Sequence, residues 1–194
     1  MELLQSHTFD LVTGLSVLTV IGLVIATILI LCLLIEILQK RSVASVSWCA
    51  RYAMPLMLCV AMTATLGSLF FSEIAGWNPC KLCWYQRIFM YPQVLLLLIA
   101  LWKKDKNIAV YVLALSLLGM LVSAHHYSEQ LALAMQPVPD ASLIPCDASG
   151  VSCAKTEIRF TFGFITLPMM AFTAFVLNAL GAASMLRRKT RKAS

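Results

Sequence analysis

Residues 78–87 read "NPCKLCWYQR" and lie between two long apolar runs of a 194-residue chain that is 60% hydrophobic. The stretch holds two cysteines in a C-x2-C arrangement, and an arginine follows the second cysteine by four residues. Its polar residues interrupt the apolar sequence on either side. The pattern therefore predicts two membrane spans joined by a short loop that carries a cysteine pair.

The composition of the whole chain favours a membrane protein. Only 12% of the residues are charged, whereas soluble domains carry roughly 25%, and the mean hydropathy is +0.85. Such a chain has no room for a separate soluble catalytic domain, so chemistry must take place at helix ends or in short loops. The net charge of +6 does not indicate nucleic-acid binding, because the basic residues gather at the ends of apolar segments.

The predicted fold is all-α, with five spans at residues 11–38, 52–75, 84–102, 108–127 and 162–186. Each is long enough to cross about 30 Å of hydrocarbon. The first segment has no basic residues before it and exceeds the length of a signal-peptide core, so we expect a retained anchor. Pro55, Pro92 and Pro168 fall inside predicted spans, where they would kink or locally unwind the helix.

The positive charges predict the orientation of the chain. They form three clusters that fall on one side of the membrane if there are five spans: Lys40, Arg41 and Arg51; Lys103, Lys104 and Lys106; Arg187, Arg188, Lys189, Arg191 and Lys192. The positive-inside rule makes that side cytoplasmic. We therefore expect the N-terminus outside, the C-terminus in the cytoplasm and two loops facing out.

This topology sorts the seven cysteines. The two outward loops hold Cys80, Cys83, Cys146 and Cys153, whereas we expect Cys32, Cys49 and Cys59 to be small packing residues or reduced thiols. Disulfides persist outside the cytosol, so the four outward cysteines are candidates for redox chemistry. A structural staple gains most from closing a long loop, which a C-x2-C pair does not do.

Two metal-centred alternatives fit the cysteines less well. A zinc ribbon has two tight C-x2-C knuckles, but "CDASGVSC" separates Cys146 from Cys153 by six residues. Haem attachment needs a histidine directly after the second cysteine, and Trp84 stands there. The C-x2-C spacing is instead that of thiol–disulfide oxidoreductases, and we predict no metal site.

The sequence before the third span predicts a helix start at the cysteines. Asn78 is a good N-cap residue and Pro79 is favoured at the first helical position, which puts Cys80 and Cys83 in the first turn, where a thiolate is stabilised. Arg87 would lie on the face of Cys83, either reaching out to the interface or holding an anion. We expect the aromatic residues Trp77, Trp84, Tyr85 and Tyr91 to form an interfacial belt.

The segments "CKLCWYQRIFMYP" (residues 80–92) and "FITLPMMAF" (residues 164–172) resemble the DsbB/BdbC disulfide bond formation proteins. The resemblance implies a four-helix redox core at residues 52–186, an additional N-terminal span and loop at 1–51, and a basic tail at 187–194. Members of that family reoxidise a soluble thioredoxin-like (DsbA-like) thiol oxidase outside the cytoplasm and pass the electrons to a membrane quinone. The close spacing of the second pair is more similar to the BdbC branch.

The resemblance also implies roles for individual residues. Cys80 and Cys83 would be the pair next to the quinone, ubiquinone or menaquinone, with Cys83 contacting it and Arg87 helping to hold it. Cys146 and Cys153 would face the soluble partner. The family has a polar residue near the outer end of the third core helix, for which His125 and His126 are both candidates.

The sequence therefore predicts a quinone-dependent protein-dithiol oxidoreductase in a bacterial cytoplasmic (inner) membrane, surrounded by lipid. Two alternatives stay open at this point. The chain could be a non-enzymatic protein, such as a transporter component, with two structural disulfides. It could also be a membrane protein that binds metal through its cysteines.

Overall fold

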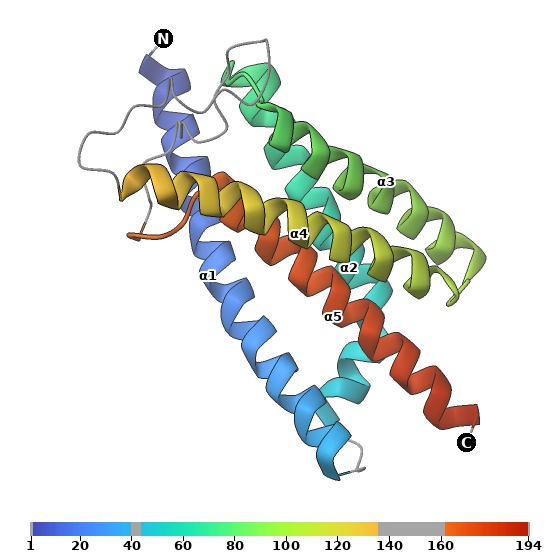
Figure 1. Ribbon diagram of the computed structural model, residues 1–194. Coiled ribbons are helices and arrows are strands. Elements are labelled where there is room, and N and C mark those ends of the chain that lie inside the picture. Colours follow the sequence, from blue (N-terminus) through green and yellow to red (C-terminus); the bar gives the residue numbers. More distant parts are fainter. Residues whose placement is uncertain (1, 40–43, 136–161, 194) are drawn as a thin grey trace.

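The computed structural model describes residues 2–39, 44–135 and 162–193, and every element it defines there is a helix (Figure 1). The five long helices are α1 (Glu2–Gln39), α2 (Ala44–Leu69), α3 (Lys81–Lys103), α4 (Ile108–Ala134) and α5 (Leu167–Ala193). All five are long and apolar enough to cross a membrane. This confirms the five predicted spans and the all-α fold.

The helices follow from the apolar sequence. In hydrocarbon no water is available to bond backbone N–H and C=O groups, so a spanning segment must satisfy them within itself. Pro55 and Pro92 lie inside α2 and α3, which continue through them. The prediction for Pro168 was wrong: it is the second residue of α5, and a proline in the first turn removes no helical hydrogen bond.

The start of α5 also differs from the prediction of residue 162. Phe162 and Gly163 have positive φ angles of 51° and 82°, so the chain turns there, and α5 begins at Leu167. The predicted division between anchor and core at residues 51 and 52 falls within α2.

The helix α5 occupies the centre of the bundle and packs against α1, α2 and α4. Glycines permit the close approaches: a Cβ on Gly119 of α4 would lie 2.3 Å from the ring of Phe175, and one on Gly181 would lie 2.8 Å from Cγ of Met57. Both distances are shorter than carbon atoms tolerate. The absence of a side chain at these glycines therefore allows α4 and α2 to pack closely against α5.

The two ends of the chain lie at opposite ends of the bundle (Figure 1). One end holds the connection between α2 and α3. There α2 passes into a π-helical turn, Phe70–Ile74, and the chain runs through Gly76, with φ 70°, to the start of α3. Single π-helical turns are frequent at functional sites. This end of the bundle carries the cysteine pair.

Candidate active site

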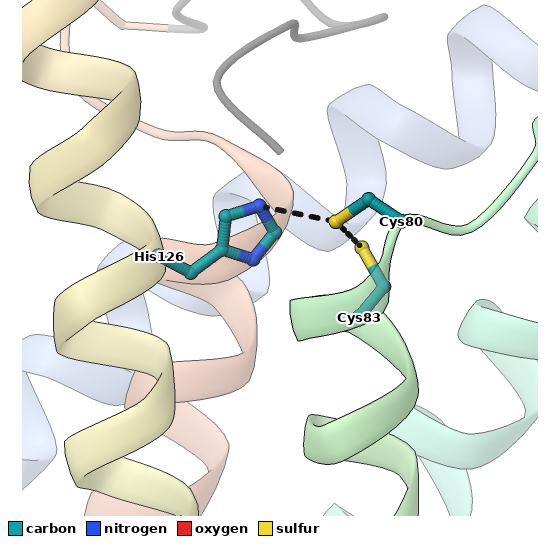
Figure 2. A group of neighbouring side chains, drawn as sticks. All are labelled: Cys80, Cys83 and His126. Carbon is teal, nitrogen blue, oxygen red and sulfur yellow. Dashed lines mark hydrogen bonds between the residues drawn. The ribbon is translucent and has the colours of Figure 1, made fainter. Parts of the chain in front are cut away.

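The cysteine pair lies at the N-terminal end of α3 (Figure 2). Cys80 is the N-cap residue, with extended backbone angles, and its carbonyl accepts the first helical bond from the Trp84 N–H at 3.1 Å. The predicted N-cap at Asn78 was therefore wrong, because the helix begins at Lys81. Cys83 lies in the first turn of the helix, as expected.

Three chemically active atoms meet at this point. The sulfur atoms of Cys80 and Cys83 are 3.3 Å apart, and Nε2 of His126 on α4 lies 3.7 Å from the Cys80 sulfur (Figure 2). Cys80 is only 5% exposed and His126 only 2%. Both cysteines are free thiols, close enough for a disulfide to form after small side-chain rotations.

Gln86 orients the imidazole of His126. Its Nε2 lies 3.0 Å from Nδ1 of His126, and an amide N–H can only donate, so Nδ1 accepts this bond. The proton of the neutral ring then stays on Nε2, which is the atom nearest to Cys80. The contact therefore sets the ring to donate a hydrogen bond toward the Cys80 sulfur. Gln86 was not singled out from the sequence.

The neighbouring His125 lies elsewhere. Its side chain is 63% exposed and its Nε2 is 3.3 Å from Oε1 of Glu129, one turn along α4. The structure brings His126, and not His125, to the cysteine pair.

The surroundings of Cys80 lower its pKa to about 4. The main cause is the hydrogen bond that Cys83 donates to the Cys80 thiolate, and His126 and the backbone N–H of Cys83 add to it. Burial opposes them, because it favours the neutral thiol. These contacts favour the thiolate form of Cys80 at neutral pH.

Arg87 is buried rather than extended toward the interface. It is 9% exposed, and its Nε and Nη2 donate to the hydroxyl and the carbonyl oxygen of Ser68 on α2, each at 3.1 Å. Its guanidinium carbon lies 5.1 Å from the centre of the Trp84 ring, within cation–π range. The hydroxyl of Tyr91 also donates to Ser68, at 3.2 Å.

The aromatic belt is only partly realised. Trp84 and Tyr85 are 54% and 40% exposed, as interfacial side chains would be. Trp77 instead stacks on Phe71, with centroids 4.9 Å apart and an interplanar angle of 4°. Trp77 and Tyr91 belong to the wall of a cavity.

This cavity has a volume of about 430 Å³, within the range of ligand pockets. Its polar end is formed by Cys80, Cys83, Gln86, Arg87, His126 and Gln130. The rest of its wall is mainly apolar and comes from α1, α2, the connection between α2 and α3, α3 and α5. An apolar space that ends at a thiolate and a guanidinium suits a flat apolar molecule with hydrogen-bond acceptors.

Two site residues besides Gln86 were not anticipated from the sequence. Ser68 gave no local signal, because only the packing of α2 against α3 brings it to Arg87. Gln130 is 5% exposed, and its Oε1 has no hydrogen-bond partner among the described residues. A glutamine near the end of an apolar span was the signal available for it.

The remaining cysteines divide as follows. Cys49 is buried and Cys32 is half-buried, as packing residues are. Cys59 is exposed on α2 and contributes to the cavity wall. Cys146 and Cys153 lie outside the described residues.

Comparison with known proteins gives consistent results. Residues 50–185 match the profile of the family described as disulfide bond formation protein DsbB. The disulfide bond formation protein C of Bacillus subtilis is 48% identical over 118 residues, 61% of this chain and 80% of its own. The probable disulfide formation protein C of Halalkalibacterium halodurans is 45% identical over 130 residues, 66% of this chain and 89% of its own.

The match covers the cysteine pair, Arg87 and His126, and leaves α1 outside. No solved structure matches the chain. The family match favours a disulfide-forming protein over the transporter alternative. The chain belongs to the DsbB family and is a multi-pass membrane protein that forms disulfide bonds.

Proposed function

We propose that this protein oxidises the dithiol of a soluble, DsbA-like thiol oxidase outside the cytoplasm and passes the two electrons to a membrane quinone. The observation that carries the proposal is that a cysteine pair, with Cys80 buried and Cys83 half-buried, lines an apolar cavity within the membrane-spanning bundle. Soluble oxidants would not need such a cavity, whereas a lipid-soluble oxidant would.

The residues around the cavity fit a quinone. The ring would lie against Cys83, Arg87 would donate hydrogen bonds to a carbonyl oxygen, and His126 would border the ring beside Cys80. Arginine carries five N–H donors, and Ser68 takes two of them. His125 has no such place, because it pairs with Glu129 away from the cavity. A bound quinone supplies an acceptor for two electrons and two protons.

The chain's own groups prepare the dithiol for oxidation. The thiolate of Cys80 is held by Cys83 and His126. When Cys80 and Cys83 form a disulfide, the thiolate–thiol pair loses two electrons and the one proton of Cys83. The acceptor takes both electrons and that proton, and its second proton comes from water. The fixed cation of Arg87 stabilises negative charge beside Cys83.

The second pair serves the soluble partner. A thiolate of the partner attacks the disulfide between Cys146 and Cys153, and the partner's other thiol resolves the mixed disulfide. The two thiols released then exchange with the disulfide of Cys80 and Cys83. Each exchange breaks one disulfide and forms another. Two electrons therefore pass from the partner, through Cys146 and Cys153, to Cys80 and Cys83.

We assign Cys146 to the mixed disulfide with the partner. The Cys153→Ser protein lacks the thiol that can displace the partner from Cys146, and a partner whose second cysteine is replaced by serine cannot release itself. Their mixed disulfide, formed with a mild oxidant, should accumulate on a non-reducing gel. Trapping of the partner by Cys80→Ser or Cys83→Ser instead would reverse the assignment of the two pairs.

The proposal places the protein in a bacterial cytoplasmic membrane, with the N-terminus and the cysteine pairs outside. The chain ends lie at opposite ends of the bundle, as termini on opposite sides of the membrane would (Figure 1). The distribution of lysine and arginine supports the cytoplasmic placement of the C-terminus. Reporter fusions at Lys104 and at the C-terminus should read cytoplasmic, and one at Asp147 exterior. A cytoplasmic reading at Asp147 would refute the orientation.

The direct test uses the purified full-length protein in lipid nanodiscs. Addition of a reduced DsbA-like protein and menaquinone or ubiquinone should produce quinol and oxidised dithiol in equal amounts. Failure to reduce either quinone while the protein is folded would refute the proposal.

One observation favours the metal-binding alternative. The ligand atoms of Cys80, Cys83 and His126 all lie within 4.8 Å of one another, a donor set that zinc accepts. That alternative predicts stoichiometric zinc in the purified protein and no quinone reduction. Metal analysis of the same preparation separates the two functions.

A further inference from the structure

We infer that α1, which lies outside the family match, forms the wall of the cavity that binds the apolar polyprenyl tail of the quinone. The inference rests on the proposed function. It adds a binding role for a helix that composition alone marks as an anchor.

The cavity extends well away from the thiols along α1. Its wall includes Leu15, Leu18, Thr19, Ile21, Gly22 and Ile25 of α1. Residues 15–25 of a helix span about 15 Å. Residues 167–177 of α5, which face the same cavity, span a similar length. The ring of a quinone does not fill such a length, but an isoprenoid chain does.

The helix α1 is held against the bundle beside this wall and within it. Near the thiol end, Val12 packs with Phe71 in a small apolar cluster. Below it, Gly22 lies against α5, so close that a Cβ there would be 3.0 Å from Cγ2 of Thr173. The wall is therefore part of the folded bundle rather than a loosely attached span.

A buried ion pair holds the other end of α1. Glu36 is 3% exposed, and its Oε1 accepts hydrogen bonds from Arg187 at 3.0 Å and Arg191 at 3.3 Å, both on α5. A carboxylate within a span is costly unless it is paired. This pairing gives a physical reason for the far end of α1 to stay tied to α5.

The occupant follows from the distribution of polar groups. The polar end of the cavity is at the cysteine pair, and the α1 side is apolar apart from Thr19, whose hydroxyl already donates to the Leu15 carbonyl at 2.8 Å. Leu18 and Ile25 of α1 and Cys59 of α2 are exposed and also line the cavity. The cavity thus meets the lipid between α1 and α2, where a long tail can leave it.

A pair of matched substitutions tests the wall. Thr19 is 6% exposed and lines the cavity. Thr27 is exposed, does not line it, and donates to the carbonyl of Leu23 at 2.8 Å in the same manner. Thr19→Phe fills the cavity, and Thr27→Phe places the same ring in lipid.

The two variants are compared with menaquinone, which carries a polyprenyl tail, and with duroquinone, a ring without a tail. Thr19→Phe should raise the KM for menaquinone about tenfold, the effect of excluding roughly two buried CH₂ groups. Its KM for duroquinone should stay within about twofold of the unaltered protein. Thr27→Phe should leave both values unchanged.

A second measurement on the unaltered protein does not depend on turnover or on the folding of a variant. In oxidised protein, N-ethylmaleimide labels Cys59 at the cavity mouth, and mass spectrometry follows the rate. Menaquinone at ten times its dissociation constant should slow this labelling roughly tenfold. Duroquinone should not, and labelling of Cys32, which does not line the cavity, should be unaffected by either.

The outcomes separate the inference from the function on which it rests. A folded protein that reduces neither quinone refutes the proposed function. If both quinones are reduced but the two phenylalanine variants behave alike, only the inference is refuted. The inference is also refuted if menaquinone does not change the labelling rate of Cys59 and this rate depends instead on the acyl-chain length of the nanodisc lipid. In that case a lipid chain occupies the cavity.

Discussion

Two glutamines on α3, Gln86 and Gln93, show how differently the bundle uses buried polar groups. They are seven residues apart, so they lie two turns apart on nearly the same helix face. Gln86 is 9% exposed and Gln93 is fully buried. Yet Gln86 contacts the reactive groups, whereas Gln93 links α3 to α4 and α5.

Gln86 belongs to what we term the thiol cluster, formed by Cys80, Cys83, Gln86 and His126. All four residues line the cavity. Each contact in the cluster controls a proton: Gln86 fixes the tautomer of His126, and His126 and Cys83 stabilise the Cys80 thiolate. The polar groups here face a space that another molecule can enter.

Gln93 belongs to what we term the amide cluster, with Ser116 of α4 and Asn178 of α5. Its Oε1 accepts bonds from Asn178 Nδ2 at 2.9 Å and from Ser116 Oγ at 3.4 Å, and its Nε2 donates to the Phe89 carbonyl at 3.0 Å. All three residues are fully buried and none lines the cavity. Phe175, packed over Gly119, lies in the same part of the bundle.

The contrast teaches that burial of a polar side chain does not by itself indicate function. Both clusters contain amides inside membrane spans, where polar groups are usually functional. What distinguishes the thiol cluster is a cavity beside it and a sulfur whose pKa is shifted. We therefore expect changes in the thiol cluster to alter chemistry, and changes in the amide cluster to alter stability.

The largest effect should come from Arg87, next to the thiol cluster. Arg87→Gln removes the fixed cation beside Cys83, and loss of one preorganised donor typically costs about 10²–10³ in rate. Arg87→Lys keeps the charge without the planar fork, so an intermediate loss is expected. The measurement is steady-state oxidation of a reduced partner across quinone concentrations.

Exchange with the partner should be spared, because it needs no quinone. A single-turnover thiol exchange assay without quinone checks this, and Arg51→Gln, at an exposed arginine of α2, is the matched control. Unchanged quinone kinetics in Arg87→Gln would leave this side chain with the purely structural role of bridging α3 and Ser68.

The sequence predicted the five spans, the position of the cysteine pair near a helix start and the proximity of Arg87 to it. These depend on composition and on helical spacing, both of which are local. It did not distinguish His125 from His126, since consecutive helix residues point about 100° apart and only packing decides which one faces α3. Ser68 and the cavity wall on α1 likewise depend on contacts between distant segments.

The helix start itself shows a second limit. Asn78 and Pro79 have the local preferences of an N-cap and a first helical residue, yet the helix begins after Cys80. Tertiary packing overrides such preferences. Trp77 stacks on Phe71, and Cys80, whose backbone is extended, lies against His126.

The second prediction concerns the pH dependence of the Cys80 thiolate. Because its pKa is lowered to about 4, the thiolate persists at every pH well above 4 and is lost only as the pH falls toward that value. The rate at which iodoacetamide alkylates Cys80 in the reduced protein, followed by mass spectrometry, should then vary by less than about twofold between pH 6 and 8. Glutathione, an ordinary thiol with a pKa near 8.5–9, should react up to about 100-fold faster at pH 8 than at pH 6.

Two variants identify the cause. Cys83→Ala removes the main hydrogen bond to the thiolate, so its profile should approach that of glutathione. His126→Ala removes a weaker contribution and should shift the profile less. If alkylation of Cys80 in Cys83→Ala were still independent of pH between 6 and 8, the interaction between the two sulfurs would not set the pKa of Cys80.

The smallest effects should come from the two glutamines themselves. Gln86→Leu frees the ring of His126, so we expect the alkylation profile of Cys80 to move to higher pH. Turnover should fall about tenfold, less than the roughly 10²–10⁴ of a group that transfers the proton itself, because Gln86 acts only through His126. The variant's free energy of unfolding should change by less than about 1 kcal/mol, because Gln86 borders a cavity.

Gln93→Leu is the same substitution two turns along α3. It leaves Asn178 and Ser116 without their acceptor, which should lower the free energy of unfolding by about 1 kcal/mol, and by no more than about 2 for an interhelical bond in a membrane. Its turnover and alkylation profile should match those of the unaltered protein. Unfolding by denaturing detergent, measured beside quinone reduction in the same preparations, gives both quantities. If Gln93→Leu slowed turnover as much as Gln86→Leu without lowering stability, the amide cluster would take part in the chemistry, and the distinction drawn from the cavity would be wrong.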